Sequence, residues 1–393
     1  MKRQEIKMVC PEHRRRVYVA MSGGVDSSVA AALLKKRGFD VVGVFMKPWQ
    51  PKIGSFCMWK EDREDAMRAA SVLGIPFETW DFSEQYKKSV TDYMVREYKA
   101  GRTPNPDVMC NKEIKFGLFF DRAIKKGADF IATGHYIKIR KEWLAKRALR
   151  KEAGMVSRRD ERLTKAMRTL AGRSNGSLGN YSFRLLVARD KNKDQSYFLW
   201  TLKQKHLEKC LFPVGDYTKP EVRKLAKKFS LPNYDKKDSQ GVCFIGPLDM
   251  KGFLKTRIKS RKGKILNLTG KILGEHDGVY YYTIGQRHGL NLSIGGGPYY
   301  VVSKNIKKNI IYVGEEKDLY SKKLKVSEIS WINEEPKLPT QLDVRLRYRA
   351  GLKKAILKKN GKLELKTPER AITSGQSAVF YRKGELLGGG TIL

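Results

Sequence analysis

The feature that most constrains the fold is a glycine-rich turn between a predicted strand and a predicted helix. Residues 16–21 are an apolar run typical of a buried strand, and Ser22-Gly23-Gly24-Val25-Asp26-Ser27-Ser28 follows directly. Residues 25–37 then carry apolar side chains at helical spacing, and Gly38 ends the pattern. Two glycines allow the sharp turn that aims successive N–H groups at an anion, and a helix N-terminus adds positive potential. The pattern predicts a phosphate-binding loop; the alternative is a plain glycine turn capped by serine.

Asp26 distinguishes this loop from the GxxxxGK[ST] phosphate loop, which carries a lysine instead. A carboxylate at this position can hold Mg²⁺ beside bound phosphates, because Mg²⁺ prefers oxygen ligands and usually shares them with its substrate. We therefore expect Asp26 to be a magnesium ligand.

The first 140 residues alternate strand-like and helix-like segments, which predicts an α/β fold with a doubly wound parallel sheet. The expected strands are 41–46, 77–81 and 130–133, and the expected helices are 61–73 and 83–99, the latter opened by a Ser83 cap. We expect the pattern to resume with a strand at 183–188 and a helix at 219–229. Residues 141–182 interrupt it as a basic insertion, with 11 Lys or Arg against 4 Asp or Glu. This insertion is either an RNA-contacting segment or simply a solvated excursion.

Beyond residue 280 the sequence pattern changes to short strand-like segments separated by turns rich in Gly, Asn and Lys. This pattern is typical of a small antiparallel β-barrel. The expected strands are 280–284, 299–303, 310–313, 342–347 and 378–381. The sequence thus predicts a catalytic domain over 1–246, a central linking module over 247–297 and a C-terminal barrel over 298–393.

Charge points to the class of partner. The chain has 80 Lys plus Arg against 41 Asp plus Glu, a formal net charge of +39, which favours association with a polyanion such as nucleic acid. A general lysine bias of the source proteome is the alternative explanation. No apolar run is long enough to span a bilayer, and the basic start lacks the apolar core of a signal peptide. The 5 cysteines form no CxxC pair, so we expect a reducing, cytoplasmic compartment and no membrane association.

Two cysteine motifs suggest sulfur chemistry. In residues 101–112, two prolines predict a rigid loop that presents Asp107 and Cys110 at the next helix start, where the helix dipole and Lys112 favour a thiolate. Taken alone, a cysteine entering a helix is more often a packing residue than a catalytic one. Residues 238–246 carry a second thiol, Cys243, in a short apolar stretch.

Taken together, these motifs resemble the tRNA-specific 2-thiouridylase (MnmA) family of PP-loop ATP pyrophosphatases. The phosphate loop is shared with other ATP pyrophosphatases, whereas the two cysteine motifs and a late GQSAVFY segment, in this order, are specific. The resemblance covers nearly the whole chain and rests on SGGVDSS (22–28), FMK (45–47), GRTPNPDVMCNKEIKF (101–116), ATGHY (132–136), NKDQSYFL (192–199), DSQGVCFIG (238–246), GEHDG with YTIGQRHGL (274–290) and GQSAVFY with GGG (375–390).

The resemblance implies an enzyme that thiolates the wobble uridine at position 34 of tRNA, with ATP and Mg²⁺ as cofactors and AMP and pyrophosphate as products. The tRNAs expected are those for Lys, Glu and Gln, and the protein is expected to act as a monomer. It implies ATP contacts from Ala20, Met21, Ser22, Gly23, Gly24, Val25, Asp26, Ser27, Met46 and Gly134.

The resemblance also implies the roles of the thiols. Cys243 would receive persulfide sulfur from a carrier protein or a cysteine desulfurase, and Cys110 would pair with it in a disulfide that closes each turnover. Asp107 is the expected acid/base. The implied tRNA contacts are Asn105, Pro106, Asp107, His135, Lys193, Asp194, Gln195, Arg347, Tyr348 and Gln376. Taken alone, His135 could be a satisfied turn histidine, and Arg347, Tyr348 and Gln376 ordinary strand and turn residues.

Two other functions fit part of the sequence. A PP-loop ligase acting on small metabolites, such as an argininosuccinate or GMP synthetase, shares the loop but needs neither a thiol pair nor a large positive charge. A non-enzymatic RNA-binding protein with a decayed loop would not need Asp26, Cys110 or Cys243, all of which are present.

Overall fold

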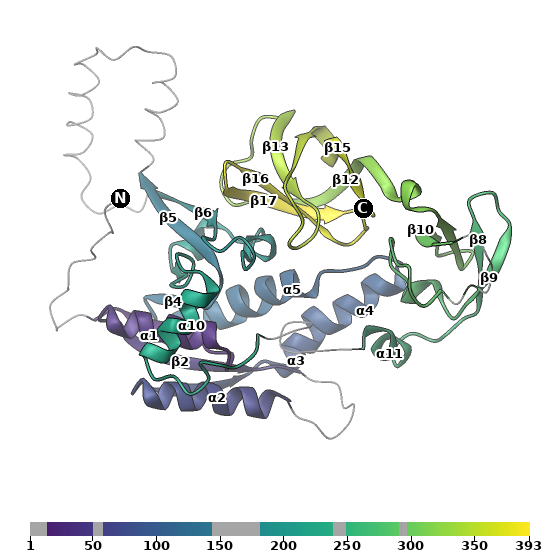
Figure 1. Cartoon of the computed structure of the whole chain (residues 1–393). Helices are drawn as coiled ribbons and strands as arrows, with labels where there is room; N and C mark the ends of the chain where they lie inside the picture. The colour runs from purple at the N-terminus through teal and green to yellow at the C-terminus, as the bar shows by residue number, and fades with distance from the viewer. Residues whose placement is uncertain (1–13, 50–57, 144–180, 239–248, 291, 293–296) are drawn as a thin grey trace, which may run out of the picture.

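The computed structural model describes residues 14–49, 58–143, 181–238, 249–290, 292 and 297–393, and Figure 1 shows their arrangement. The N-terminal part is built on a five-stranded parallel sheet in the order β3-β2-β1-β4-β7. Its strands are β1 (Arg16–Ala20), β2 (Asp40–Lys47), β3 (Phe77–Asp81), β4 (Phe130–Thr133) and β7 (Cys210–Leu211). The predicted doubly wound α/β domain is confirmed.

Strand β1 shows why this sheet needs helices on both faces. Its apolar side chains alternate between two cores: Val17 and Val19 pack in one cluster, and Tyr18 and Ala20 in the other. A strand buried on both faces reads as a continuous apolar run, which is how residues 16–21 could be recognised. One face is covered by α1 (Val25–Lys36), α2 (Met58–Val72) and α10 (Lys219–Lys228), and the other by the helices between residues 83 and 125.

Those helices differ in detail from the prediction. Residues 83–99 form α3 (Ser83–Tyr86), a π-helical turn η2 (Lys87–Thr91) and α4 (Asp92–Lys99). Ser83 is not the cap: it is the first helical residue, and its N–H donates to Asp81 Oδ1 at 2.9 Å. The next helix is α5 (Pro106–Met109), continued by a π-helical stretch η3 (Cys110–Phe119) and α6 (Phe120–Lys125).

A second, mixed sheet of four strands follows α11 (Met250–Lys255), in the order β10-β11-β8-β9. Its strands are β8 (Gly263–Asn267), β9 (Ile272–His276), β10 (Tyr300–Asn305) and β11 (Ile310–Gly314). Their core also includes Met94 and Tyr98 of α4, so the module packs on the catalytic domain. The predicted strand at 280–284 is wrong, because Val279–Tyr281 is a 3-10 turn, η6. The division at 297 stays a prediction, but β10 pairs with β11, and β11 pairs with β8, so these two strands belong to the four-stranded sheet and not to the barrel.

The C-terminal barrel is closed by six antiparallel strands in the order β12-β15-β14-β13-β16-β17, with β17 pairing back to β12. The predicted antiparallel barrel is therefore confirmed. Its strands are β12 (Tyr320–Trp331), β13 (Thr340–Arg345), β14 (Lys353–Leu357), β15 (Lys362–Arg370), β16 (Ser377–Arg382) and β17 (Glu385–Ile392). The described residues also form three further 3-10 turns, which are η5 (Ser196–Phe198), η7 (Glu316–Leu319) and η8 (Lys359–Gly361). A short helix, α9 (Gln204–Leu207), precedes β7.

A hairpin from the catalytic domain extends the barrel sheet. Strands β5 (Ile137–Trp143) and β6 (Tyr181–Val187) pair antiparallel, and β6 pairs with β17. Residues 183–188 therefore do not resume the parallel sheet as predicted. Residues 181–185 of β6 alternate between apolar or aromatic and polar side chains. Arg184 joins three strands through Glu142 at 2.5 Å and Glu385 at 3.0 Å. The insertion was predicted over 141–182, but residues 141–143 belong to β5 and residues 181–182 to β6. Residues 144–180 lie outside the described part.

The parallel sheet locates the place for a ligand. From β1 the chain adds β2 and β3 on one side and β4 and β7 on the other, so the strand order reverses between β1 and β4. Ligands of open α/β sheets bind at such a switch point, at the carboxyl ends of the strands. The loops after β1 and β4 carry the predicted phosphate loop and Gly134. Helices of membrane-spanning length and apolarity are absent from the described ranges.

Candidate active site

The glycine-rich loop lies at the switch point with the geometry of an anion cradle. Gly23 has a φ of +78°, and a Cβ there would clash with the backbone carbonyl of Asp62, so only glycine fits. Gly24 is the N-cap of α1 and supplies no side chain to cap it. The Ser27 hydroxyl donates to Gly24 O at 3.0 Å and accepts from Ser22 N at 3.2 Å, which fixes the turn. The first amides of α1 are thus available to a bound anion.

The loop after β4 closes against the same helix start. A Cβ on Gly134 would lie 2.7 Å from Ser27 N, so this close approach requires glycine. Ala20, Met21 and Met46 are 7%, 1% and 3% exposed, which makes their side chains part of the core beneath the site. Val25 is likewise buried. Of the predicted ATP-binding residues, the structure therefore brings together residues 20–27 and Gly134, with Ser22 exposed at the surface.

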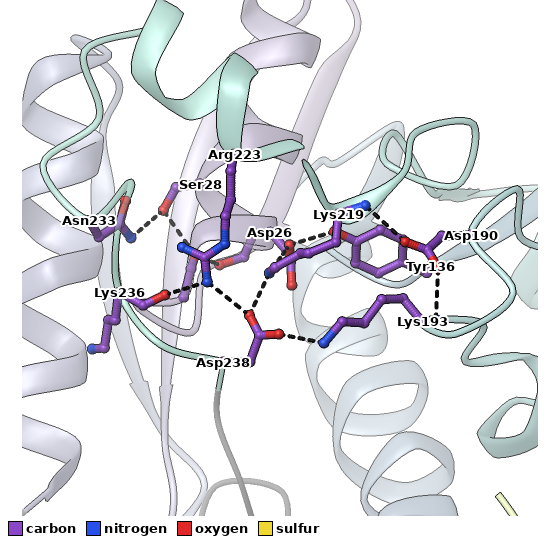
Figure 2. A network of polar contacts seen from close by, with 12 residues as sticks. Asp26, Ser28, Tyr136, Asp190, Lys193, Lys219, Arg223, Asn233, Lys236 and Asp238 are labelled. Carbon is purple, nitrogen blue, oxygen red and sulfur yellow. Dashed lines mark hydrogen bonds and ion pairs between the residues drawn. The ribbon is translucent and has the colours of Figure 1, made fainter. Parts of the chain in front are cut away.

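Asp26 lies in a polar network that the sequence did not reveal (Figure 2). Asp26 Oδ1 accepts from the Tyr136 hydroxyl at 2.8 Å and from Lys219 Nζ at 2.6 Å. Burial, together with the charge of Asp26, raises the pKa of Tyr136, so this hydroxyl remains a donor. Lys219 also contacts Asp238 Oδ1 at 2.8 Å. Tyr136 lies within the recognised ATGHY segment, but nothing in the sequence around Lys219 marks it as a site residue.

Lys219 reaches Asp26 because of how α10 begins. Thr218 N and its hydroxyl both donate to Glu221 Oε2, at 2.7 and 3.0 Å, in a capping arrangement that starts the helix. Asp190 Oδ2 accepts from Lys219 N at 2.9 Å. Helix α10 packs on α1, so the ammonium of its first residue points at the second residue of α1.

The segment that ends at Asp238 is anchored to the phosphate loop and to α2. Asn233 Nδ2 donates to Gly23 O at 2.8 Å and to Ser28 Oγ at 3.0 Å. Lys236 Nζ pairs with Asp62 at 2.7 Å and Asp65 at 2.5 Å, both on α2. Asp238 therefore stands at a defined position beside the loop.

The donor set fits Mg²⁺ bound mainly by phosphate. The part of the chain that the structure describes contains no group of three or more His, Cys, Asp or Glu placed to hold a metal. Asp26 and Asp238 do lie on either side of the Lys219 ammonium. One or two carboxylates completed by substrate phosphates and water form a typical Mg²⁺ site. Asp26 can thus serve as a metal ligand once phosphate oxygens are present.

The first cysteine motif is packed rather than exposed. Asn105 caps α5, its Oδ1 accepting from Val108 N at 3.3 Å, and Pro106 is the first helical residue. Cys110 is therefore in the second turn and not at the helix start as predicted. Its side chain is fully buried in the apolar cluster that also holds Ala20 and Met46. Asp107 is half-buried, and its carbonyl accepts from Asn111 Nδ2 at 3.0 Å.

The barrel holds this motif in place. Gln376 Nε2 donates to Thr103 O at 2.9 Å and to Pro104 O at 3.1 Å. Thr103 N in turn donates to Ser374 O at 2.8 Å. Gln376 thus positions the loop that precedes Asn105, Pro106 and Asp107.

The other predicted tRNA contacts fall into two groups. Two are buried: Asp194 is 2% exposed and pairs with Arg345 of the barrel at 2.8 Å, and His135 packs against Phe116 and Phe212. Burial, with the charge of Lys115, lowers the pKa of His135 well below its usual value, and its Nδ1 lies 2.7 Å from Thr133 Oγ1. These placements favour the alternative reading, a packed histidine, and a domain-joining role for Asp194.

The second group is partly accessible. Lys193 is paired with Asp238, and Gln195 Oε1 accepts from Tyr136 N at 2.9 Å. Arg347 donates to Ala371 O at 3.0 Å, and Tyr348 packs against Phe198 with ring centroids 4.5 Å apart. Cys243, Cys10 and Cys57 lie outside the described residues; Cys210 is buried, and burial raises the pKa of its thiol.

Comparisons with known proteins cover nearly the whole chain. Three family models match in succession: a tRNA methyl transferase HUP domain over 15–247, a tRNA methyl transferase PRC-barrel domain over 251–315 and an aminomethyltransferase beta-barrel domain over 321–392. The tRNA-specific 2-thiouridylase MnmA 2 of Geobacillus kaustophilus is 43% identical over 389 residues, 97% of this chain and 95% of that protein. The tRNA-specific 2-thiouridylase MnmA of Bacillus subtilis is 41% identical, over 96% of this chain and 94% of that protein.

Proposed function

The chain belongs to the tRNA-specific 2-thiouridylase (MnmA) family, and on that premise we propose that it replaces the 2-oxygen of the wobble uridine of tRNA with sulfur, using ATP. The observation that carries this proposal is identity of 43% over 97% of the chain, which spans the phosphate loop, both cysteine motifs and the barrel. The net charge of +39 suits a tRNA substrate.

In the first step, the O2 atom of the uridine attacks the α-phosphorus of ATP, and pyrophosphate leaves. The new O–P bond makes the 2-oxygen part of AMP, a far better leaving group. The amides at the start of α1 face the phosphates and stabilise the charge that develops on them. A Mg²⁺ ion held by Asp26 would neutralise part of the same charge.

In the second step, sulfur replaces AMP. A persulfide on Cys243 supplies the sulfur, by either of two routes. Its outer sulfur attacks C2 and expels AMP, and the Cys110 thiolate then cleaves the S–S bond at the Cys243 sulfur. Alternatively, the Cys110 thiolate first attacks Cys243 and frees sulfide, which attacks C2. Both routes release 2-thiouridine and leave a Cys110–Cys243 disulfide, which a dithiol reductant must reopen. Asp107 is the acid/base of this proposal.

Burial of Cys110 bears on this step. A thiol that is fully covered by apolar side chains is protected from unrelated oxidants but cannot meet a second sulfur. We infer that tRNA binding uncovers it, because the loop before Cys110 is held by the barrel through Gln376, and both surfaces would face the tRNA.

Substrate and partners follow from the same chemistry. An unpaired anticodon base can leave its stack at a cost of only a few kcal/mol. Proteins recognise individual RNA bases mainly in such single-stranded loops. We propose wobble uridines of the Lys, Glu and Gln tRNAs as substrates, a persulfide-carrying protein or cysteine desulfurase as sulfur donor, and a monomer in the cytoplasm as the working form. Arg347, Tyr348 and the exposed Lys and Arg side chains of the barrel would contact the RNA.

The decisive experiment is mass spectrometry of wobble nucleosides from tRNA incubated with the protein, ATP, Mg²⁺ and a persulfide source. We expect 2-thiouridine with wild type and none with Cys243→Ser, which should still release pyrophosphate. Cys210→Ala is the matched control, because that thiol lies on β7, the edge strand of the parallel sheet, and no step of the proposal uses it, so its loss should leave the product unchanged.

Other products would contradict the proposal. A methylated nucleoside would support the transferase named in the family descriptions instead. Consumption of ATP on a small metabolite, unaffected by Cys243→Ser, would support a metabolite ligase.

A further inference from the structure

One carboxylate in the described chain is surrounded by three cations. Asp238 Oδ2 accepts from Lys193 Nζ, and Asp238 Oδ1 lies 2.8 Å from Lys219 Nζ and 3.4 Å from Arg223 Nη2 (Figure 2). The three basic side chains come from two separate segments, the loop before η5 and helix α10. They converge although like charges repel, so the site is built to hold an anion.

The cluster adjoins the phosphate loop. Lys219 Nζ is also 2.6 Å from Asp26 Oδ1, on the second residue of α1. Asn233, from the segment that ends at Asp238, donates to Gly23 O within the loop at 2.8 Å. An anion held by Lys193, Lys219 and Arg223 would therefore lie next to whatever the amides of α1 bind.

The cations of this cluster are matched by internal carboxylates. Lys193, Lys219 and Arg223 contribute three positive charges, and Asp26, Asp190 and Asp238 three negative ones; Asp190 accepts from Lys193 N at 3.1 Å and from Lys219 N at 2.9 Å. A polyphosphate must therefore displace a carboxylate to bind here. Burial opposes ionisation of Asp238, but hydrogen bonds from Lys193 and Lys219 outweigh it and lower the pKa of Asp238 to about 2. Asp238 is thus a full anion at neutral pH, although its side chain is only 32% exposed.

A second carboxylate shows that such clusters are not all alike. Asp277 in the central module is held by Lys251 at 3.1 Å and Lys255 at 2.7 Å. Asp277 lies in the central module, whereas the phosphate loop lies at the start of α1. Only the Asp238 cluster combines converging cations with an anion cradle, among the residues that the structure describes.

We propose that Lys193, Lys219 and Arg223 bind the β- and γ-phosphates of ATP and the pyrophosphate product, and that Asp238 occupies this subsite as an internal carboxylate until nucleotide displaces it. The inference rests on the proposed use of ATP and adds the residues that receive the leaving group. It also gives Lys193 a role at the phosphates rather than at the anticodon arm.

Displacement has a measurable consequence. A carboxylate that competes for the cations weakens polyphosphate binding, so its removal must strengthen it. Ion pairs of this exposure are worth a few-fold to about tenfold in affinity. Binding is measured with full-length protein, Mg²⁺ and either pyrophosphate or ATP, by calorimetry and without tRNA.

We expect Asp238→Asn to tighten pyrophosphate and ATP binding by about three- to tenfold relative to wild type. Asp235→Asn is the matched control: it removes the same charge three residues away on an exposed side chain and should leave both affinities unchanged. A thermal melt shows whether each variant is folded.

The cations provide an independent arm if Asp238→Asn does not fold. Lys193→Met and Arg223→Gln should each weaken pyrophosphate binding by about tenfold, because each removes a charge-assisted hydrogen bond to phosphate. Lys224→Met, on the exposed face of the same helix as Arg223, should have no effect.

Specific results overturn the inference. Unchanged or weaker pyrophosphate binding by folded Asp238→Asn would show that Asp238 is not a competitor, and unchanged binding by Lys193→Met and Arg223→Gln would show that the cations do not receive phosphate. If the variants change pyrophosphate affinity as expected but the wild-type protein does not thiolate tRNA, only the proposed function is contradicted. Absence of any wild-type binding of ATP and pyrophosphate would sink both.

Discussion

The two ends of the candidate active site are held by different forces. At the phosphate end, formed by Asp26, Lys219 and Asp238, charged side chains contact one another and remain 11% to 32% exposed. At the thiol end, formed by Asn105, Asp107 and Cys110, the cysteine is fully buried in an apolar cluster and the loop is fastened to the barrel by backbone and amide hydrogen bonds.

This difference separates binding from chemistry. Charges at the phosphate end can exchange one anion for another with little rearrangement of the fold. The thiol end must be uncovered before its sulfur can react. Under the proposed mechanism, a protein built this way would bind ATP while its thiol stays protected, and would react only when tRNA engages the barrel and the catalytic domain together. Variants at the two ends should therefore fail at different steps.

The largest effect is expected at the thiol end. Cys110→Ala should lower 2-thiouridine formation by about three orders of magnitude or more, the scale of losing a nucleophile that acts in concert with others. Pyrophosphate release in the presence of tRNA should continue, since that step needs no thiol. Both products are measured in one time course. Equal loss of both would mean that Cys110 is needed for the fold of the site rather than for sulfur transfer.

A smaller effect at the opposite step is expected from Asp26→Asn. Losing the charge that we propose holds Mg²⁺, and that pairs with Lys219, should slow pyrophosphate release about a hundredfold. Affinity for tRNA, measured by filter binding, should stay within about twofold, because the RNA contacts proposed for Arg347 and Tyr348 lie on the barrel. A parallel fall in tRNA affinity would break the separation between the two ends.

Acid should reveal the ion pairs of the phosphate end. The pKa of Asp238 is about 2 in the folded protein, below the value of about 3.9 for an unfolded aspartate. Its stabilising contribution is therefore complete above about pH 4 and is lost as the pH falls towards 2. We expect Asp238→Asn to lack about 1 kcal/mol of this acid-sensitive stability in urea melts. Asp235→Asn should behave as wild type, and an identical acid profile for Asp238→Asn would contradict the ion pairs.

Local signals in the sequence were enough for much of the fold. The apolar run at β1, the glycines at its end and the helical period of α1 are properties of neighbouring residues, and β3 at residues 77–81 was predicted to the residue. The predicted roles of Asp26 and Cys110 came from motifs of the same local kind and stay predictions.

What the sequence could not show depends on contacts between distant segments. Lys219 meets Asp26 across 193 residues, and Gln376 reaches Pro104 across 272. Strand β6 was assigned to the wrong sheet because its pairing with β17 is set by the barrel, which forms some 200 residues later in the chain. Burial of His135 and Asp194 is likewise a tertiary property, which motif resemblance does not report.

The smallest effect is expected from the hairpin. Trp143 pairs with Tyr181 at the described ends of β5 and β6, so a two-residue Asn-Gly turn can join them directly. Replacing 144–180 with this turn should change the free energy of unfolding by less than about 0.5 kcal/mol, because every strand pair is kept. Deleting 141–182 instead removes strand residues and the Glu142 contact of Arg184, so it should destabilise the hairpin measurably in urea melts.

If the shorter deletion lowers tRNA affinity while ATP affinity is unchanged, the basic segment belongs to RNA binding. If aggregation follows, the segment is part of the fold, and the hairpin is not the self-contained extension of the barrel that its strand pairing indicates.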